Sequence, residues 1–305
     1  MDIVLAKSAG FCFGVKRAVN SVYDEIENHN TGIYTYGPII HNEQVVQDME
    51  SKGVKVIDDL EGLKIITEGT VIIRSHGVEK SIYDLLENKK IRIVDATCPF
   101  VKKIHKIVFE ESANGREVII IGNDKHPEVE GIKGWVNGKA WVVNNSEDVE
   151  KITIKSDSKV CIVSQTTFNH NKFKYLVEII EKKGYDINVV NTICNATHER
   201  QAEAKEISSK VGAMIVIGGR HSSNTQKLYD ICKEECENTF FIQTTDDLKE
   251  GSEFYSYMKS CEGNSLKSIG ITAGASTPNN IIEEVVLNVR DEFWTNVGWI
   301  IQDNS

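Results

Sequence analysis

The sequence predicts an α/β protein built from three similar small domains with mainly parallel sheets. Short β-branched runs alternate with segments of helical periodicity along the chain, a pattern typical of parallel strands joined by right-handed crossovers. Three cysteines, Cys12, Cys98 and Cys194, each follow a short apolar run and precede a helical segment, at nearly even intervals. We therefore expect one such cysteine in each domain, with the three converging on one point.

The individual elements follow from hydrophobic periodicity and turn residues. Strands are predicted at residues 3–6, 32–38, 70–74, 91–94, 117–122, 160–164, 187–190, 213–218 and 268–272. Helices are predicted at residues 42–52, 79–88, 225–235 and 278–289, the last with Pro278 as its first residue.

These elements divide the chain into three predicted domains, at residues 1–97, 98–193 and 194–290. The first strand, within residues 1–13, is a candidate strand of the third domain. Residues 291–305, which include Trp294 and Trp299, form a C-terminal tail with no clear partner strand.

Bulk composition narrows the class of protein. A chain of 305 residues is too long for one small core, and its 40% hydrophobic and 26% charged residues are ordinary for a soluble globular protein. The net charge of −10 argues against general binding to nucleic acid or to anionic membranes. No apolar run approaches the roughly 18–20 residues of a membrane span, and the N-terminus lacks signal-peptide features. The 7 cysteines are too sparse for a disulfide scaffold, so we expect reduced thiols and a cytoplasmic location.

The three loop cysteines suggest a metal centre. Three thiolates without a local Cys-x-x-Cys pair fit a 4Fe–4S cluster that keeps one iron open for substrate. The alternative is three unrelated buried thiols, since free cysteine is often buried. The remaining cysteines are interpreted as structural: Cys161, Cys232, Cys236 and Cys261.

Polar residues gather where predicted strands end and helices begin, the edge at which parallel sheets bind ligands. They are His41, His76, His126, Glu128, Thr166, Ser222, Ser223, Asn224 and Ser276. Free amide N–H groups and the helix dipole at such positions favour anions, so a phosphate or diphosphate ligand is expected. Taken one at a time, Ser222, Asn224 and Ser276 are more commonly helix caps, and a single histidine at a strand end is more often structural than a ligand. Three histidines at three strand ends together favour a shared site.

The ordered set of motifs resembles the 4-hydroxy-3-methylbut-2-enyl diphosphate reductase family. The resemblance runs from about Ile3 to Val289 without a missing motif. The matching segments are Gly-Phe-Cys-Phe-Gly-Val around Cys12, His41-Asn42, Ser75-His76-Gly77-Val78, Asp95-Ala96-Thr97-Cys98-Pro99, His126-Pro127-Glu128-Val129-Glu130-Gly131, Ser164-Gln165-Thr166-Thr167, Ser222-Ser223-Asn224 and Thr272-Ala273-Gly274-Ala275-Ser276.

The resemblance implies a trefoil of three α/β domains around a central 4Fe–4S cluster held by Cys12, Cys98 and Cys194. It implies that Glu128 is the proton donor and that a small carrier such as ferredoxin or flavodoxin supplies electrons. It also implies a set of substrate-binding residues, mostly for the diphosphate: His41, His76, His126, Thr166, Ser222, Ser223, Asn224 and Ser276.

Two other functions remain open at this point. One is a different three-domain 4Fe–4S enzyme, a hydro-lyase or a quinolinate-synthase-like enzyme, which would need no reductant. The other is a non-enzymatic iron–sulfur sensor, which would need no enclosed anion pocket.

Overall fold

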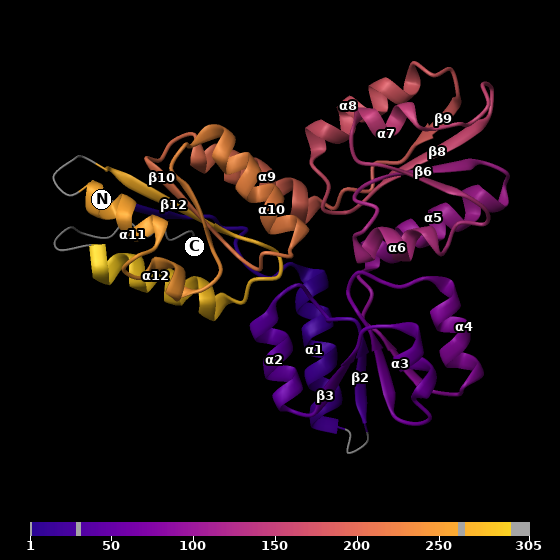
Figure 1. Cartoon of the computed structure of the whole chain (residues 1–305), viewed down its shortest axis with the longest axis horizontal. Coiled ribbons are helices and arrows are strands. Elements are labelled where there is room, and N and C mark those ends of the chain that lie inside the picture. The colour runs from indigo at the N-terminus through magenta and orange to yellow at the C-terminus, as the bar shows by residue number, and fades with distance from the viewer. Residues whose placement is uncertain (1, 29–31, 262–265, 294–305) are drawn as a thin grey trace, which may run out of the picture. The chain divides into compact units, whose positions relative to one another are not determined.

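The computed structural model describes residues 2–28, 32–261 and 266–293 and contains three parallel sheets of four strands each (Figure 1). The predicted α/β class is therefore confirmed. Trp294 and Trp299 of the predicted tail lie outside the described residues. No helix in the described part of the chain is both long and apolar enough to cross a membrane.

The first sheet has the strand order β3-β2-β4-β5. Its strands are β2 (Ile33–Tyr36), β3 (Val54–Ile57), β4 (Thr70–Ile73) and β5 (Arg92–Asp95). Its helices are α1 (Phe13–Asn28), α2 (Glu43–Ser51), α3 (Leu60–Ile65) and α4 (Lys80–Asn88). Helices α3 and α4 pack against Val71 and Ile73 on one face, and α1 and α2 lie on the other side in Figure 1.

The second sheet has the order β7-β6-β8-β9. Its strands are β6 (Glu117–Ile121), β7 (Ala140–Val143), β8 (Lys159–Ser164) and β9 (Asp186–Val189). Its helices are α5 (Pro99–Ala113), α6 (Pro127–Lys133), α7 (Ser146–Glu150) and α8 (His170–Glu181). Alternate strand residues face opposite cores, so α5 and α6 cover one face while α7 and α8 cover the other.

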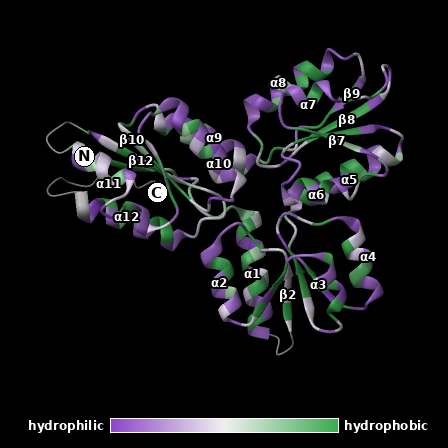
Figure 2. Cartoon of the chain, viewed as in Figure 1, coloured by the Kyte–Doolittle hydropathy of each residue, from purple (hydrophilic) through white to green (hydrophobic). Residues whose placement is uncertain are grey.

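The third sheet has the order β1-β12-β10-β11. Its strands are β10 (Ala213–Ile217), β11 (Thr239–Ile242), β12 (Ser268–Ala273) and β1 (Asp2–Leu5). Its helices are α9 (Asn195–Ser208), α10 (Ser223–Glu235), the 3-10 turn η1 (Thr245–Leu248), α11 (Glu253–Ser260) and α12 (Asn279–Phe293). Figure 2 shows hydrophobic residues concentrated on the strands, as expected for sheets covered on both faces.

All three sheets share one topology. We number the strands of each sheet from one to four, starting at β2, β6 and β10. The spatial order is then second, first, third and fourth in every sheet. In the third sheet the fourth place is taken by β1, which pairs in parallel with β12 from Asp2↔Ser268 to Leu5↔Ile271. The fourth strand of each sheet is therefore the one that precedes Cys98, Cys194 or Cys12.

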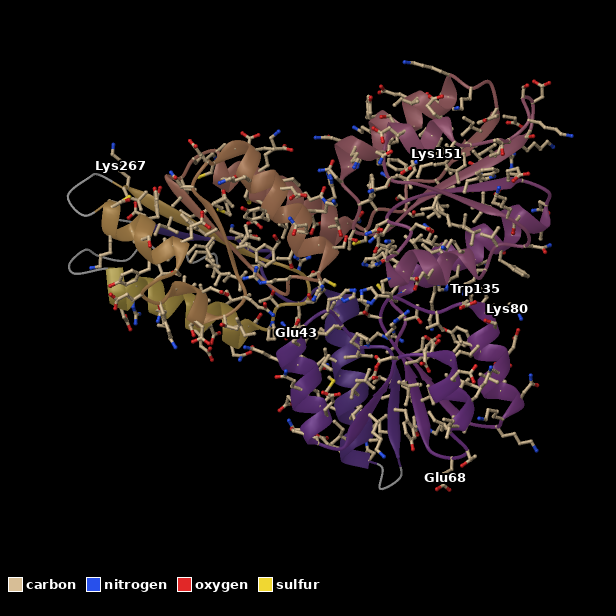
Figure 3. All side chains as sticks on the ribbon, viewed as in Figure 1. Glu43, Glu68, Lys80, Trp135, Lys151 and Lys267 are labelled. Atoms are coloured by element: carbon tan, nitrogen blue, oxygen red, sulfur yellow. The ribbon has the colours of Figure 1, made fainter. Side chains whose placement is uncertain are left out.

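The chain forms two compact units. Residues 13–194 hold the first two sheets, and residues 1–12 together with 195–305 contain the third. Within the first unit, Trp135 links the two sheets (Figure 3): its indole N–H donates to the Val78 carbonyl at 2.9 Å and its ring stacks on His105. His105 in turn lies under Gly77, whose positive φ of 71° and missing Cβ leave room for the imidazole.

Most predicted elements match within one or two residues at each end. Asn42 and Ser222 cap α2 and α10 through their side chains, so α2 begins at Glu43, one residue after its predicted start, and α10 at Ser223, two residues before its predicted start. The strands absent from the prediction are β3, β7 and β11, each four residues long and at the edge of a sheet. Helix α12 continues to Phe293, beyond the predicted end at Val289.

Candidate active site

The predicted site residues occupy equivalent positions in the three sheets. The position five residues after the first strand holds His41, His126 and Ser222. The position three residues after the third strand holds His76, Thr167 and Ser276. Since strand order reverses between these neighbouring strands, the side chains lie at the switch point where open α/β sheets bind ligands. Thr167 occupies this position, although only its neighbour Thr166 was predicted to bind substrate.

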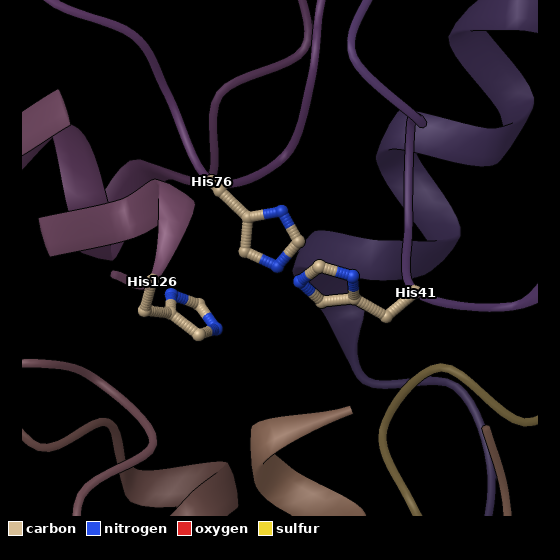
Figure 4. A group of neighbouring side chains, drawn as sticks. All are labelled: His41, His76 and His126. Atoms are coloured by element: carbon tan, nitrogen blue, oxygen red, sulfur yellow. The ribbon is translucent and has the colours of Figure 1, made fainter. Parts of the chain in front are cut away.

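Three imidazoles meet in the first unit (Figure 4). The ring centroids of His41 and His76 are 4.5 Å apart, and the His126 centroid lies 5.5 Å and 5.4 Å from them. One ring nitrogen from each residue lies within 4.8 Å of the others. Nδ1 of His76 is buried without a hydrogen-bond partner among the described residues, which marks a place for a ligand atom.

The tautomer of His126 favours an anion over a metal ion. Its Nδ1 caps helix α6 by accepting the Glu128 backbone N–H at 3.1 Å. The neutral ring must then carry its proton on Nε2, which makes Nε2 a donor rather than a metal ligand. A metal-binding histidine instead donates from its second nitrogen to an acceptor. The imidazole group is therefore built to donate to oxygen.

Burial favours the neutral form of two of these rings, His76 and His126, by lowering their pKa values. It lowers the pKa of His126 to about 3, with His41 and Arg74 lowering it further. Burial also holds the pKa of His76 well below its ordinary value, and the neighbouring imidazoles and Arg74 act in the same direction. A bound anion would oppose these effects, because negative charge favours protonated imidazole. Binding of an anion would therefore raise the pKa values of His76 and His126 and favour their protonated forms.

Glu128 lies beside the histidine group on the first turn of α6 and is 1% exposed. Its Oε1 accepts the Thr166 backbone N–H at 2.6 Å, and its Oε2 accepts the Thr166 hydroxyl at 2.7 Å. Burial raises the pKa of Glu128 to about 7, although both Thr166 hydrogen bonds act to lower it. A carboxyl group with such a pKa can release a proton near neutral pH.

The serine-rich loops form a separate polar group in the second unit. Ser222 caps α10 by accepting the Thr225 N–H at 3.3 Å, and the buried Ser276 hydroxyl donates to Ser222 Oγ at 3.4 Å. Asn224 is 5% exposed, and its Nδ2 has no hydrogen-bond partner in the part of the chain that the structure describes. Ser222 therefore does cap the helix, as the alternative interpretation expected. The buried Asn224 amide close to it is not explained by capping, because its Nδ2 has no partner in the described residues.

The three loop cysteines are structurally equivalent. The backbone N–H of each donates to the carbonyl of the second residue after the third strand of its sheet. These bonds run from Cys98 to Ser75 at 2.9 Å, from Cys194 to Thr166 at 3.1 Å and from Cys12 to Ala275 at 3.3 Å. Each thiol thus lies next to the polar residues at the switch point of its own sheet.

Two observations fit these thiols to iron and set them apart from the other cysteines. A Cβ on Gly14 would lie 2.6 Å from the Cys98 Sγ, so this glycine keeps space open around the thiol. Cys12, Cys98 and Cys194 are all partly accessible. Burial instead raises the pKa of Cys161 and of Cys232 to about 12, which keeps these two as protonated core thiols.

The side chains that hold the cysteine loops were not predicted from the sequence. Arg17 donates to the carbonyls of Thr97 and Asp95 at 2.8 and 2.9 Å, just before Cys98. Arg200 donates to the Gly10 carbonyl at 2.7 Å, and Glu203 accepts the backbone N–H groups of Lys7 and Ser8. None of these side chains lies on the helix that follows the loop it holds. Arg17 holds the Cys98 loop from α1, which follows Cys12, and Arg200 and Glu203 hold the Cys12 loop from α9, which follows Cys194. No local sequence pattern identifies them, because their partners are backbone atoms far away in sequence.

Comparison with known proteins gives consistent matches over nearly the whole chain. The family model described as "LytB protein" matches residues 3–290. The 4-hydroxy-3-methylbut-2-enyl diphosphate reductase of Clostridioides difficile is 47% identical over 286 residues, which cover 94% of this chain and 98% of that protein. The enzyme of the same name from Caldanaerobacter subterraneus subsp. tengcongensis is 45% identical over 291 residues, covering 95% and 97%.

Two solved structures are also similar. A structure of (E)-4-hydroxy-3-methyl-but-2-enyl diphosphate reductase, titled as the terminal enzyme of the non-mevalonate pathway, is 40% identical with a TM-score of 0.68. It matches 95% of this chain and 100% of that one. The E-1-hydroxy-2-methyl-but-2-enyl-4-diphosphate reductase from Plasmodium falciparum is 28% identical with a TM-score of 0.86, covering 95% and 88%.

Proposed function

This chain belongs to the LytB protein family, and we propose that it converts 4-hydroxy-3-methylbut-2-enyl diphosphate to isopentenyl and dimethylallyl diphosphate. This is the last step of the non-mevalonate isoprenoid pathway. The reaction consumes two electrons and two protons: the allylic hydroxyl leaves as water after taking one proton, and the carbon skeleton takes the other. Neither a hydro-lyase nor an iron–sulfur sensor is favoured, because the relatives carry the reductase name.

The proposed cofactor is one 4Fe–4S cluster held by Cys12, Cys98 and Cys194. The equivalent placement of the three thiols and the space that Gly14 leaves at Cys98 support this ligand set. When bound, such a cluster supplies electrons and an open iron that acts as a Lewis acid toward the allylic hydroxyl. The protein side chains have to bind the diphosphate and deliver the proton.

Diphosphate binding is assigned to uncharged donors. His41, His76 and His126 would donate to phosphoryl oxygens, and the neutral His126 presents an Nε2–H for this. Four further side chains are also assigned to substrate binding: Ser222, Ser223, Asn224 and Ser276. Two buried nitrogens without a partner among the described residues support this assignment, Nδ2 of Asn224 and Nδ1 of His76. A phosphoryl oxygen would accept a hydrogen bond from the Asn224 amide, and also from the His76 ring when Nδ1 carries its proton.

Glu128 is assigned as the proton donor, and its environment is the observation that carries the proposal. The carboxyl group is fully buried beside the imidazoles, and its pKa is raised to about 7. A protonated carboxyl at neutral pH can protonate the departing hydroxyl and so release water. Thr166 would orient that carboxyl through its two hydrogen bonds and contact the substrate hydroxyl.

The electrons would come from a small reduced carrier such as ferredoxin or flavodoxin, and the cytoplasm is the proposed location. Neither a nucleic acid nor a membrane partner is proposed, in line with the net charge of −10.

An anaerobic reconstitution experiment tests the function. The purified chain is loaded with iron and sulfide, then given dithionite-reduced methyl viologen and the substrate, and the products are identified by mass spectrometry. We expect both isoprenoid diphosphates, with two electrons consumed per product. Water addition or removal without consumption of reductant would instead indicate a hydro-lyase. Absence of any turnover by protein with a full cluster would favour the sensor.

A further inference from the structure

We propose that the exposed face of helix α5 is the docking surface for a small acidic one-electron carrier protein. This α5 face consists of Phe100, Lys102, Lys103, Lys106 and Phe109. The inference rests on the proposed function, because that reaction requires electrons from outside the chain. Electrons would enter the protein at the α5 face, and the carrier would be recognised there by its negative charge.

The α5 face begins at the proposed iron ligand. Helix α5 starts at Pro99, directly after Cys98. Its inner residues Ile104 and Val108 pack in the core of the second sheet, so the opposite side of the helix faces outward. A carrier bound there would lie close to the Cys98 thiolate, with little protein between it and the proposed cluster.

The α5 face combines the residue types found at transient interfaces. Phe100 and Phe109 are each 44% exposed. Exposed aromatic side chains supply apolar contact area in an interface, while charged residues steer the approach of the partner. The two rings lie at opposite ends of the three lysines along the helix.

The three lysines of the α5 face outnumber the exposed Glu110 that lies among them, so the local charge is opposite in sign to that of the whole chain. Lys102 pairs with Asp95 at 2.6 Å, and Lys106 lies 3.7 Å from Glu110. Lys103 forms no ion pair within the described residues, so its charge is uncompensated there. A further exposed lysine, Lys16, lies on the first turn of α1. That turn is next to Cys98, because its Gly14 packs against the Cys98 thiol.

These charges select an acidic partner. A protein with a net charge of −10 repels an acidic carrier over most of its surface, so a local basic face determines where such a carrier can approach. An iron–sulfur cluster passes electrons singly, so each turnover needs two encounters. Rapid exchange is best served by a small interface formed by charge attraction, as in other electron-transfer complexes.

The test compares Lys103→Glu with Lys174→Glu in the cluster-loaded enzyme. Lys174 is an exposed lysine on α8, which covers the other face of the same sheet, so its reversal changes the net charge equally. Stopped-flow absorbance measures the second-order rate constant for electron transfer from a reduced acidic bacterial ferredoxin. Turnover with methyl viologen, a small cationic reductant, is measured in parallel.

We expect Lys103→Glu to slow electron transfer from ferredoxin by about 10-fold or more at low salt, the lower range of electrostatic steering. The difference should shrink as salt is added. Phe100→Ala should slow it at high salt as well, because its contribution is apolar contact. Viologen-driven turnover should be unchanged in both variants and in Lys174→Glu.

Equal ferredoxin rate constants for Lys103→Glu and Lys174→Glu would overturn the proposal. Lys103→Gln, which removes the charge without reversing it, provides a milder variant if the reversal lowers the yield of folded protein. If the unaltered, cluster-loaded enzyme showed no turnover with methyl viologen, the proposed reductase function would be refuted. This result differs from equal ferredoxin rate constants, which would refute only the docking surface.

Discussion

Thr166 binds the Glu128 carboxyl at both oxygens, with its backbone N–H on Oε1 and its hydroxyl on Oε2. The same residue uses its carbonyl to accept the backbone N–H of Cys194. One threonine therefore connects the proposed proton donor to a proposed iron ligand. Burial favours the neutral carboxyl and these hydrogen bonds favour the ionised one, and the balance places the pKa at about 7.

Glu128→Gln keeps the size of the side chain but cannot release a proton. We expect the variant to assemble its cluster and to bind substrate with nearly normal affinity, while turnover falls by about 10²–10⁴-fold, the usual effect of general acid–base catalysis. Iron content, substrate titration and single-turnover kinetics measure the three quantities. Normal turnover by this variant would move proton delivery to His126 or to a bound water.

Thr166→Val removes the hydroxyl donor to Glu128 and keeps the backbone N–H. If Glu128 must be protonated, activity falls as pH rises through about 7. Loss of a hydrogen bond that stabilises the carboxylate raises the pKa further, so the alkaline limb of the kcat/KM profile should move to higher pH. Thr166→Ser keeps the hydroxyl and should leave the limb in place. A shift toward lower pH in Thr166→Val would contradict this assignment.

The cysteine assignment predicts a clear division between the thiols. Replacing Cys12, Cys98 or Cys194 by Ser should each reduce iron content and abolish turnover, because thiolate is the ligand that cluster iron prefers. Cys232→Ser is the matched control and should retain the full iron content. Iron and sulfide analysis with the visible spectrum gives the answer, and loss of cluster only in the control would reverse the assignment.

The anion site predicts weaker substrate binding without loss of cluster. His41→Asn, His76→Asn and Ser276→Ala should each cost roughly 1.5–3 kcal/mol of binding free energy, the contribution of one hydrogen bond to a charged group. Calorimetric titration with substrate, or with pyrophosphate as a simpler anion, measures the change. If affinity were unaltered in all three, these side chains would be only structural.

Gly14→Ala tests the space around Cys98. The added methyl group would lie 2.6 Å from the Cys98 Sγ, so either the thiol or helix α1 must move. We expect reduced iron content at a melting temperature close to that of the unaltered apoprotein. Val15→Ala, on the same helical turn, serves as the control and should keep its iron. Full cluster content in Gly14→Ala would show that the thiol has room to shift.

Sequence periodicity predicted the central strands of the second sheet well because they are long enough and apolar enough to show it. β6 and β8 are almost continuous runs of Val and Ile, as strands buried on both faces require. The missed strands β3, β7 and β11 have only four residues each, and β3 also includes the charged Lys55. Their place is set by pairing with a neighbour, as with Val54 against Ile33, and not by local pattern.

The polar positions of the site were accessible from sequence because they follow recognisable strands. His41, His126 and Ser222 fall at the same distance after the first strand of each sheet. What the sequence could not provide is the state of these groups. The Nδ1 acceptor role of His126 and the raised pKa of Glu128 both depend on burial and on partners brought together by folding.

The pairing of β1 with β12 has a consequence for the order of events during biosynthesis. Cys12 is the first of the three thiols to leave the ribosome, yet its loop is fixed by Arg200, Glu203 and Ala275, all translated much later. Until β12 emerges, the segment that bears this thiol has no strand beside it and no fixed shape. The proposed cluster would therefore be inserted only into a nearly full-length polypeptide, so we expect ribosome-bound chains truncated before Ser268 to be apoprotein.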